Sequence, residues 1–306
     1  MKSCIRIGTR HSQLALWQST YIAGLLQKRY PECDIRLQKI TTTGDKILDK
    51  PLAKIGGKGL FTKELEQELL DGTIDLAVHS LKDMPTQLPA NLCLTAITAR
   101  TSPYDVLVSK KYQHFAELPA GAVLGTSSLR RQAQLLAVRP DLKLVNLRGN
   151  VDTRLRKLEE GTLDGIILAE AGLTRLGHAN RISEVLLPPL CLPAVGQGAL
   201  AIETRTDNAE IRQLLAFLND EDTAYATTAE RAFLGLVNGG CLVPMGIFGQ
   251  VRGELLHVDA VIASLDGKKV IRDSIEGKKT TCQTLGVTLG KRMLDQGGRE
   301  ILAAIL

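Results

Sequence analysis

Six arginines stand where a folded chain could use them to hold an anionic ligand. A guanidinium group presents paired donors that match a carboxylate or a phosphate, and a helix N-terminus adds free N–H groups and the positive end of its dipole. The repeated pairing predicts a ligand with many negative groups. For Arg154 and Arg175, ion pairing on the protein surface is a simpler alternative. Each arginine lies close to a Gly, Ser or Thr at an expected strand-to-helix turn: Arg10, Arg130, Arg131, Arg148, Arg154 and Arg175.

The turn before residue 129 is the most specific of these anion sites. The hydroxyls of Thr126 and Ser128 precede Arg130 and Arg131, so hydroxyls, free N–H groups and guanidinium groups would converge on one anion. Consecutive residues of a helix point in different directions. We therefore expect only one of the two arginines to face the ligand.

A carboxylate follows a compact apolar strand expected over 74–78. Ser80, Lys82 and Asp83 come soon after it, and the carboxyl ends of strands are where ligands bind in open α/β sheets. Nearby positive charge keeps such a carboxylate ionised, so Asp83 could stabilise a cation or take up a proton. The alternative is a turn-capping Asp before Pro85.

One cysteine lies apart from the apolar strands. Cys241 follows Asn238-Gly239-Gly240, residues that suit the left-handed cap at a helix C-terminus. This position would expose the thiol. An ordinary buried thiol is the simpler interpretation of these residues alone.

The segment 54–59 is cationic and rich in glycine. Lys54 and Lys58 give it the composition of a phosphate-binding loop, but the spacing of that motif is not met. We expect a mobile, cationic stretch within a long loop over 41–59.

The histidines show no spacing typical of a metal site. None of the 5 is spaced with Cys or carboxylates as metal ligands are. His79, at the end of an apolar strand, is expected to be a structural residue with a satisfied partner. We predict no metal site.

Composition is typical of a soluble globular protein with reduced thiols. The 306 residues allow two or three domains, and 44% apolar and 23% charged residues are ordinary values. The net charge of +5 is too small to indicate nucleic-acid binding by itself, and 4% aromatic residues argue against base-stacking surfaces. We see no signal segment, no membrane-spanning run and no C-x-x-C pair, so we expect a cytoplasmic protein.

Strand-like and helix-like segments alternate over the first two thirds of the chain, which indicates an α/β fold with mostly parallel sheets. A weak internal repeat of strand, Gly-Thr, hydroxyl cap and helix relates 7–12 to 124–129, and it favours two similar lobes. A small α+β region follows, with three alternating strands. Strands are expected at 4–9, 34–40, 74–78, 106–108, 122–124, 142–145, 165–168, 200–203, 247–251, 255–264 and 269–275. One helix is expected after the cap residue Ser12, and another after Ser127 or Ser128, either of which could cap it, up to residue 138. Further helices are expected at 60–70, 151–160, 209–218, 223–236, 285–295 and 299–305.

A series of segments resembles one enzyme family in the family's own order across nearly the whole chain. So many motifs in order are highly specific. The chain resembles the porphobilinogen deaminases, also called hydroxymethylbilane synthases. The matching segments are 6–10 with 12–18, 51–61, 75–85, 125–132, 147–154, 171–173, 192–198 and 239–241.

The resemblance implies a fold of three domains. Two are α/β lobes like those of periplasmic binding proteins, with a hinge crossing between them, and the third is a small α+β domain that carries the reactive cysteine. The implied bounds are 1–99 with 200–217 for the first α/β domain, 100–199 for the second, and 218–306 for the third. The family suggests a monomer.

The resemblance also implies the chemistry. Four porphobilinogen molecules are joined with loss of ammonia into the linear tetrapyrrole hydroxymethylbilane, on a dipyrromethane cofactor that Cys241 holds through a thioether. Asp83 is the implied catalytic residue, since an ionised carboxylate can stabilise the cation left by ammonia. The implied cofactor contacts are Lys82, Asp83, Ser80, Thr126, Ser128, Arg130, Arg131 and Arg148, and the implied substrate contacts are Arg10, Ser12, Lys54, Lys58, Arg148, Arg154 and Arg175.

Two other function classes compete with this interpretation. A non-catalytic two-lobed protein that binds a dicarboxylate or phosphate would share the lobes and anion sites, but it would need neither Cys241 nor Asp83. A nucleic-acid-binding protein would lose affinity steeply with salt. We expect a small-molecule substrate and neither nucleic acid nor a membrane as partner.

Overall fold

The computed structural model describes residues 3–46, 59–237 and 243–305. They form two compact units, one of Met1–Arg100 with Ala199–Ala224 and one of Thr101–Gly198 with Tyr225–Leu306. The second unit contains two separate sheets. Its division into two domains remains a prediction.

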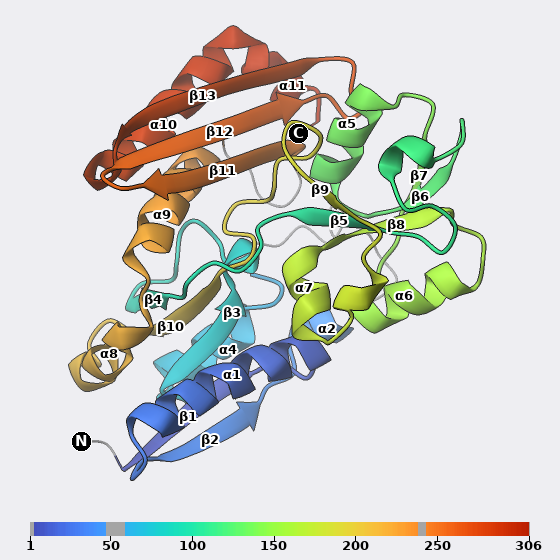
Figure 1. Ribbon diagram of the computed structural model, residues 1–306. Helices are drawn as coiled ribbons and strands as arrows, with labels where there is room; N and C mark the ends of the chain where they lie inside the picture. The colour runs from blue at the N-terminus through green and yellow to red at the C-terminus, as the bar shows by residue number, and fades with distance from the viewer. Residues whose placement is uncertain (1–2, 47–58, 238–242, 306) are drawn as a thin grey trace. The chain divides into compact units, whose positions relative to one another are not determined.

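The first unit is built on a five-stranded sheet that we call lobe 1 (Figure 1). The strand order is β2-β1-β3-β10-β4, with β1 parallel to β2 and β3, and β10 antiparallel to both its neighbours. The elements are β1 (Cys4–Thr9), α1 (Gln13–Arg29), β2 (Asp34–Lys39), α2 (Thr43–Lys46), α4 (Lys63–Leu70), β3 (Leu76–Ser80), β4 (Leu92–Ile97), β10 (Leu200–Arg205) and α8 (Ala209–Leu215).

Helices pack on both faces of the lobe 1 sheet. On one face Ile22 of α1 and Ile211 of α8 are buried against Ile5 of β1. On the other face Leu65 of α4 is buried against Ala77 of β3. Because both faces are covered, the central strands are nearly continuous apolar runs, as the sequence indicates.

The second unit begins with another five-stranded sheet, lobe 2 (Figure 1), whose order is β7-β6-β8-β5-β9. Strand β6 is parallel to β7 and β8, and β5 is antiparallel to both its neighbours. Its elements are β5 (Asp105–Val108), β6 (Val123–Gly125), α5 (Leu129–Val138), β7 (Lys143–Val145), α6 (Val151–Glu159), β8 (Gly165–Ala169), α7 (Glu170–Arg175) and β9 (Glu184–Leu186).

The two lobes share one topology. In each sheet the fourth strand is antiparallel to its neighbours. This strand is β10 in lobe 1, which follows the three parallel strands in sequence, and β5 in lobe 2, which precedes them. Strands β1 and β6 occupy equivalent places, so the internal repeat predicted from the sequence is confirmed. This is the arrangement of the lobes of periplasmic binding proteins, and the predicted fold class is confirmed.

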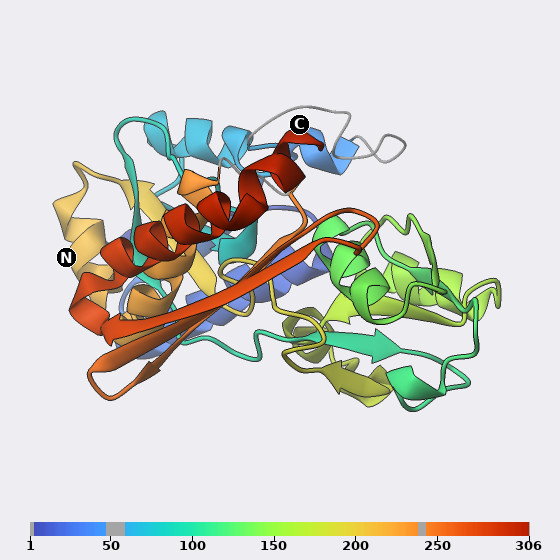
Figure 2. The same ribbon diagram turned by 90° about the horizontal axis from the view of Figure 1, so that it is seen from above.

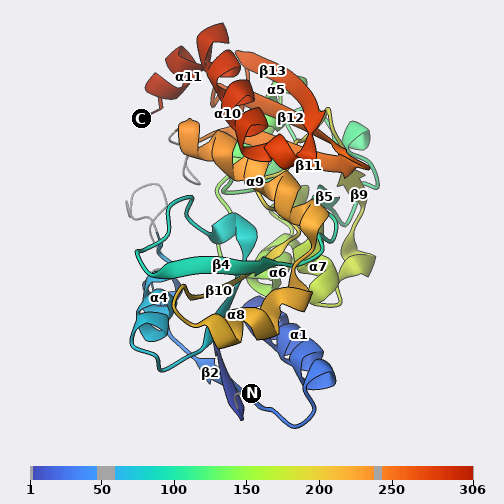
Figure 3. The same cartoon turned by 90° about the vertical axis from the view of Figure 1, so that its left-hand side faces the viewer.

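A three-stranded antiparallel meander completes the second unit, in the order β11-β12-β13. Helix α10 lies along one face of it (Figure 2), and α9 packs against α10 (Figure 3). This packing needs Gly286, because a Cβ there would lie 2.1 Å from the Ala229 carbonyl oxygen. The elements are α9 (Glu221–Leu236), β11 (Met245–Arg252), β12 (Leu255–Ala263), β13 (Val270–Lys278), α10 (Cys282–Met293) and α11 (Arg299–Ala303).

The structure adds elements that the sequence analysis did not predict: β4, β9 and α7. The segment 41–59 was expected to be a loop, but it begins with the short helix α2. Over the described residues, no helix is both long and apolar enough to cross a membrane.

Candidate functional site

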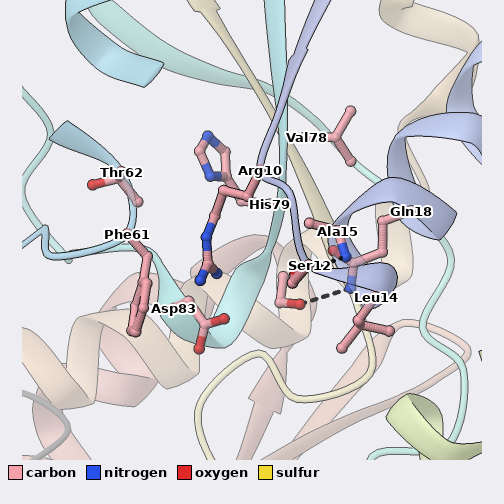
Figure 4. Close-up of a pocket in the computed structure, with 11 residues that line it drawn as sticks. Arg10, Ser12, Leu14, Ala15, Gln18, Phe61, Thr62, Val78, His79 and Asp83 are labelled. Carbon is pink, nitrogen blue, oxygen red and sulfur yellow. Dashed lines mark hydrogen bonds between the residues drawn. The ribbon is translucent and has the colours of Figure 1, made fainter. Parts of the chain in front are cut away.

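The N-terminus of α1 borders a pocket in lobe 1 (Figure 4). Ser12 is the N-cap residue, and its Oγ accepts a hydrogen bond from the N–H of Ala15 at 3.3 Å. Half-buried Arg10 lies two residues earlier, with its guanidinium carbon 4.2 Å from the centre of the Phe61 ring. A cation–π contact of this kind holds a guanidinium in place without using its hydrogen-bond donors.

The carboxyl end of β3 forms another side of the same pocket. Ser80 ends the strand, and its Oγ accepts a hydrogen bond from Nε2 of Gln18 at 2.8 Å. The 3-10 helix η1 (Leu81–Asp83) follows and brings the exposed carboxylate of Asp83 to the pocket. The predicted location of Asp83, just past the carboxyl end of a strand, is confirmed.

The pocket combines charges of both signs with an apolar wall (Figure 4). A guanidinium group, a hydroxyl and a helix N-terminus can hold a carboxylate, while the carboxylate of Asp83 can hold a cation on the same ligand. The geometry therefore suits a small molecule that carries both an acid and an amine. The lining residues are Arg10, Ser12, Leu14, Ala15, Gln18, Phe61, Thr62, Val78, His79, Ser80 and Asp83.

His79 has the satisfied partner that the sequence predicts. Its Nε2 lies 3.0 Å from Oε2 of Glu203 on the neighbouring strand β10, and both side chains are buried.

The equivalent turn in lobe 2 begins α5. Ser128 is the N-cap residue, as predicted, and its Oγ accepts a hydrogen bond from the N–H of Arg131 at 3.4 Å. The Ser128 N–H in turn donates to Oγ1 of buried Thr126 at 3.2 Å. The two hydroxyls thus lie together at the helix N-terminus, as the sequence indicates.

The two arginines of this turn are committed to an internal ion pair. Oδ2 of Asp105 accepts from Nη1 of Arg130 at 2.6 Å, and Oδ1 accepts from Nη2 of Arg131 at 2.7 Å. Asp105 is 0% exposed and each arginine 6%. Burial alone would raise the pKa of Asp105, but the two guanidinium charges outweigh it and hold that pKa far below its usual range. Both side chains therefore reach the same carboxylate, and the expectation that only one of the two arginines faces the ligand stays a prediction.

The remaining arginines of lobe 2 lie in three different settings. Arg148 is in the loop after β7, and its Nη1 is buried with no hydrogen-bond partner among the described residues. Arg154, on α6, donates from Nε to the Gly149 carbonyl at 2.8 Å. Arg175 ends α7 and donates from Nη2 to the Gly198 carbonyl at 2.7 Å. The sequence brings them to the ends of elements, but it does not show these backbone contacts.

The other predicted site residues divide by location. Lys82 is half-buried within η1, next to Asp83. Cys241, Lys54 and Lys58 lie outside the described residues. Among the residues with described positions, no group of three His, Cys, Asp or Glu could hold a metal ion.

Sequence reasoning missed several residues that build these two sites. Gln18 and Phe61 line the lobe 1 pocket, and neither carries a charge that would draw attention. Asp105 was also missed, although a signal was present: it is the acidic residue that opens the apolar run of β5. A charge at the start of a buried strand needs a partner.

Comparison with known proteins identifies the family. The family model described as "Porphobilinogen deaminase, dipyromethane cofactor binding domain" matches residues 5–213, and "Porphobilinogen deaminase, C-terminal domain" matches 224–295. Porphobilinogen deaminase of Geobacter metallireducens is 54% identical over 98% of this chain and 94% of its own, and that of Syntrophomonas wolfei is 51% identical over 97% of both chains. The crystal structure of the methionine-binding protein MetQ is 16% identical, with a TM-score of 0.46 over 75% of this chain and 95% of its own. The chain belongs to the porphobilinogen deaminase family, the transferases that polymerise porphobilinogen, with loss of ammonia, into hydroxymethylbilane on a dipyrromethane cofactor in tetrapyrrole biosynthesis.

Proposed function

We propose that the lobe 1 pocket is where porphobilinogen reacts, with Asp83 as the catalytic carboxylate. The observation that carries this proposal is that Arg10, Ser12 and Asp83 line one pocket. Porphobilinogen bears an acetate, a propionate and an aminomethyl group, so a ligand with charges of both signs matches the pocket. Arg10 and Ser12 hold a carboxylate, and Asp83 faces the amine and the cation left when ammonia departs.

Other cationic groups hold the acids of the growing chain in this proposal. Arg148, Arg154 and Arg175 contribute from lobe 2, and Lys54 and Lys58 from the segment before α4. Support comes from the substrate, because every added pyrrole brings two more carboxylates. Each charged hydrogen bond to such a group contributes about 1.5–3 kcal/mol, so loss of one cation weakens growth in steps.

The residues of lobe 2 fit the dipyrromethane cofactor. A buried, unpartnered Nη1 on Arg148 and paired hydroxyls at a helix N-terminus are what a dianionic group needs. We assign its contacts to Ser80, Lys82, Asp83, Thr126, Ser128, Arg130, Arg131 and Arg148. The cofactor supplies a pyrrole carbon on which the chain grows.

Arg130 and Arg131 act in this proposal through Asp105 as well as by charge. One carboxylate faces two guanidinium groups, so the three side chains carry a net positive charge into the lobe. That charge favours an anion at the adjacent turn. The ion pairs also fix the first turn of α5, which presents Thr126 and Ser128.

Cys241 is the attachment point in this proposal. A thioether is not cut by water as an ester is, so the cofactor survives many turnovers. The proposal includes a third domain over 218–306 that carries Cys241, the α/β domains at 1–99 with 200–217 and at 100–199, a cytoplasmic location and a monomer.

Mass spectrometry of the intact purified protein tests the assignment. We expect active wild-type protein to be heavier than the bare chain by two pyrrole units, and Cys241→Ser protein to have the bare mass and no activity. Cys33→Ser is the matched control, since Cys33 is a buried thiol of the lobe 1 core. Active protein of bare mass would contradict the assignment, and so would an active Cys241→Ser variant.

A further inference from the structure

A buried cluster of ionisable groups lies behind the lobe 1 pocket. It consists of His79 on β3, Glu203 on β10 and Glu66 on α4, with exposed fractions of 5%, 0% and 6%. The His79 Nε2 and the Glu203 Oε2 are 3.0 Å apart. Neither the catalytic carboxylate nor the anion-binding groups account for these three side chains.

The cluster contains two buried carboxyl groups, those of Glu66 and Glu203. Oε1 of Glu203 and Oε1 of Glu66 are buried, and neither has a hydrogen-bond partner among the described residues. Burial raises the pKa of Glu66, and the nearby charge of Glu203 raises it further. Two buried carboxyl groups therefore lie beside one imidazole.

His79 is the member of the pair that reaches the pocket. It lines the pocket together with Arg10 and Asp83, while Glu203 lies behind it. A buried carboxylate bonded to one ring nitrogen orients an imidazole. The charged groups around the cluster are Glu66 from α4, with Lys63 next to it, and Arg10 and Asp83 from the pocket.

The reaction needs a temporary place for a proton. In each coupling the C–N bond of the aminomethyl group breaks, and its electron pair leaves with ammonia. A C–C bond then forms to the free α-carbon of the terminal pyrrole, and that carbon loses its proton. The aminomethyl nitrogen takes up one proton as its bond breaks and leaves as ammonia, and the coupled carbon then gives one proton back, so protons and charge balance without any other reagent.

We propose that the His79–Glu203 pair gives a proton to the aminomethyl nitrogen as its C–N bond breaks and takes up the proton that the coupled carbon then releases, with Glu66 beside the pair in the cluster. This inference rests on the proposed function of the pocket. Asp83 remains the group that faces the substrate cation. His79 is the second proton-holding group.

The pH dependence of turnover separates this role from a purely structural one. His79→Asn and Glu203→Gln both keep a polar side chain but remove the titrating pair. We expect kcat to fall about tenfold or more in each, with KM within about twofold, and one limb of the kcat–pH profile to disappear. Glu66→Gln removes the ionisable carboxyl group beside the pair, so it should shift that limb.

His257→Asn is the matched control, because His257 also pairs with a carboxylate, that of Asp259 at 3.3 Å, but on the C-terminal sheet. It should leave the pH profile unchanged. A reduced kcat with a wild-type pH profile in both His79→Asn and Glu203→Gln would overturn the inference, and so would wild-type kcat. The cofactor mass of each variant is measured alongside. Absence of the cofactor from active wild-type protein would instead count against the proposed function.

Nitrogen NMR of the resting wild-type protein gives a readout that does not depend on turnover. The His79 signals are assigned by their absence from His79→Asn. The proposal requires these signals to change with pH within the range of activity, and Glu203→Gln should alter that change because the Glu203 carboxylate contacts Nε2. Signals that keep one protonation state across the pH range of activity would contradict the proposed proton uptake.

Discussion

Equivalent turns in the two lobes place their arginines in different environments. In both, a strand ends in Gly-Thr and a serine caps the following helix: Ser12 before α1 and Ser128 before α5. In lobe 1 the nearby Arg10 lies against an aromatic ring at the edge of a pocket. In lobe 2 the nearby Arg130 and Arg131 are buried against Asp105.

The difference teaches what makes a guanidinium group a candidate ligand contact. A helix N-terminus and an arginine are present in both turns, so neither feature distinguishes them. The two turns differ in burial: Arg130 and Arg131 are buried against Asp105 in lobe 2, whereas Arg10 is half-buried against an aromatic ring at the edge of a pocket. An arginine buried in this way stabilises the frame of a site, whereas one at the edge of a pocket can contact an anion there.

The largest effect should come from the carboxylate of the open pocket. Asp83→Asn removes the charge that faces the substrate cation, and we expect turnover to fall by about 10²–10⁴-fold because loss of a positioned acid or base has this cost. The side chain is exposed, so stability should change by less than about 0.5 kcal/mol. Turnover assays and urea denaturation of the same preparation measure both quantities.

Asp71→Asn is the control for this substitution, since Asp71 is an exposed carboxylate at the end of α4. It should retain full turnover. Near-normal turnover of Asp83→Asn would show that this residue only caps a turn.

The opposite behaviour is expected for the carboxylate of lobe 2. Asp105→Asn leaves two buried guanidinium groups without their counter-charge, and breaking a buried ion pair in this way costs about 3–5 kcal/mol. The free energy of unfolding from urea titration should fall by that amount. A stability equal to that of Asp83→Asn would remove the contrast between the lobes.

Acid should destabilise the native protein through Asp105 of lobe 2. The pKa of Asp105 lies far below its usual range, since the two guanidinium charges outweigh the opposing effect of burial. In the unfolded chain an aspartate has a pKa of about 3.9. A group with the lower pKa in the native state stabilises it above the unfolded value, and this contribution declines as the pH falls toward the native value.

Stability should therefore decrease from about pH 5 downward as the unfolded state takes up protons. The part due to Asp105 should be missing in Asp105→Asn, whose unfolding free energy should depend less steeply on pH. Urea titrations of both proteins at a series of acidic pH values measure this difference. Parallel curves would mean that Asp105 is not ionised in the native state.

Much of the fold could be predicted because the buried strands are short and apolar. The predicted strand 4–9 coincides with β1, and Ser12 and Ser128 cap their helices as expected. Strand β9 was missed because Glu184-Val185-Leu186 is too short to show a period. Strand β4 was missed although it is longer and follows a turn that contains Pro89 and Asn91, because Cys93 and Thr95 interrupt its apolar run.

The candidate site was less predictable, because charge alone does not show where a side chain points. Asp83 was found from its place after a strand. The direction in which the Arg130 and Arg131 side chains point depends on Asp105, which is 25 and 26 residues away in sequence. Such a partnership is created by the pairing of β5 with β8, and no local pattern in the sequence reports it.

The smallest effect concerns a thiol that shares the lobe 2 network. Cys191 is 0% exposed, and its Sγ lies 3.4 Å from Oδ2 of Asp105 and 3.5 Å from Nη1 of Arg130. Burial, with a further contribution from the Asp105 charge, raises the pKa of this thiol to about 12. Because the thiolate is the reactive form, iodoacetamide at neutral pH should leave Cys191 unmodified in native protein and modify it in urea.

Peptide mass mapping after alkylation measures this protection, and the half-buried Cys4 of lobe 1 is the internal comparison. In Asp105→Asn the network loses its central charge, so local opening should become easier and Cys191 should be alkylated faster than in wild-type protein. Rapid alkylation of Cys191 in native wild-type protein would show that lobe 2 opens readily. In that case the ion pairs of Asp105 with Arg130 and Arg131 open readily, and the two turns differ less than these ion pairs indicate.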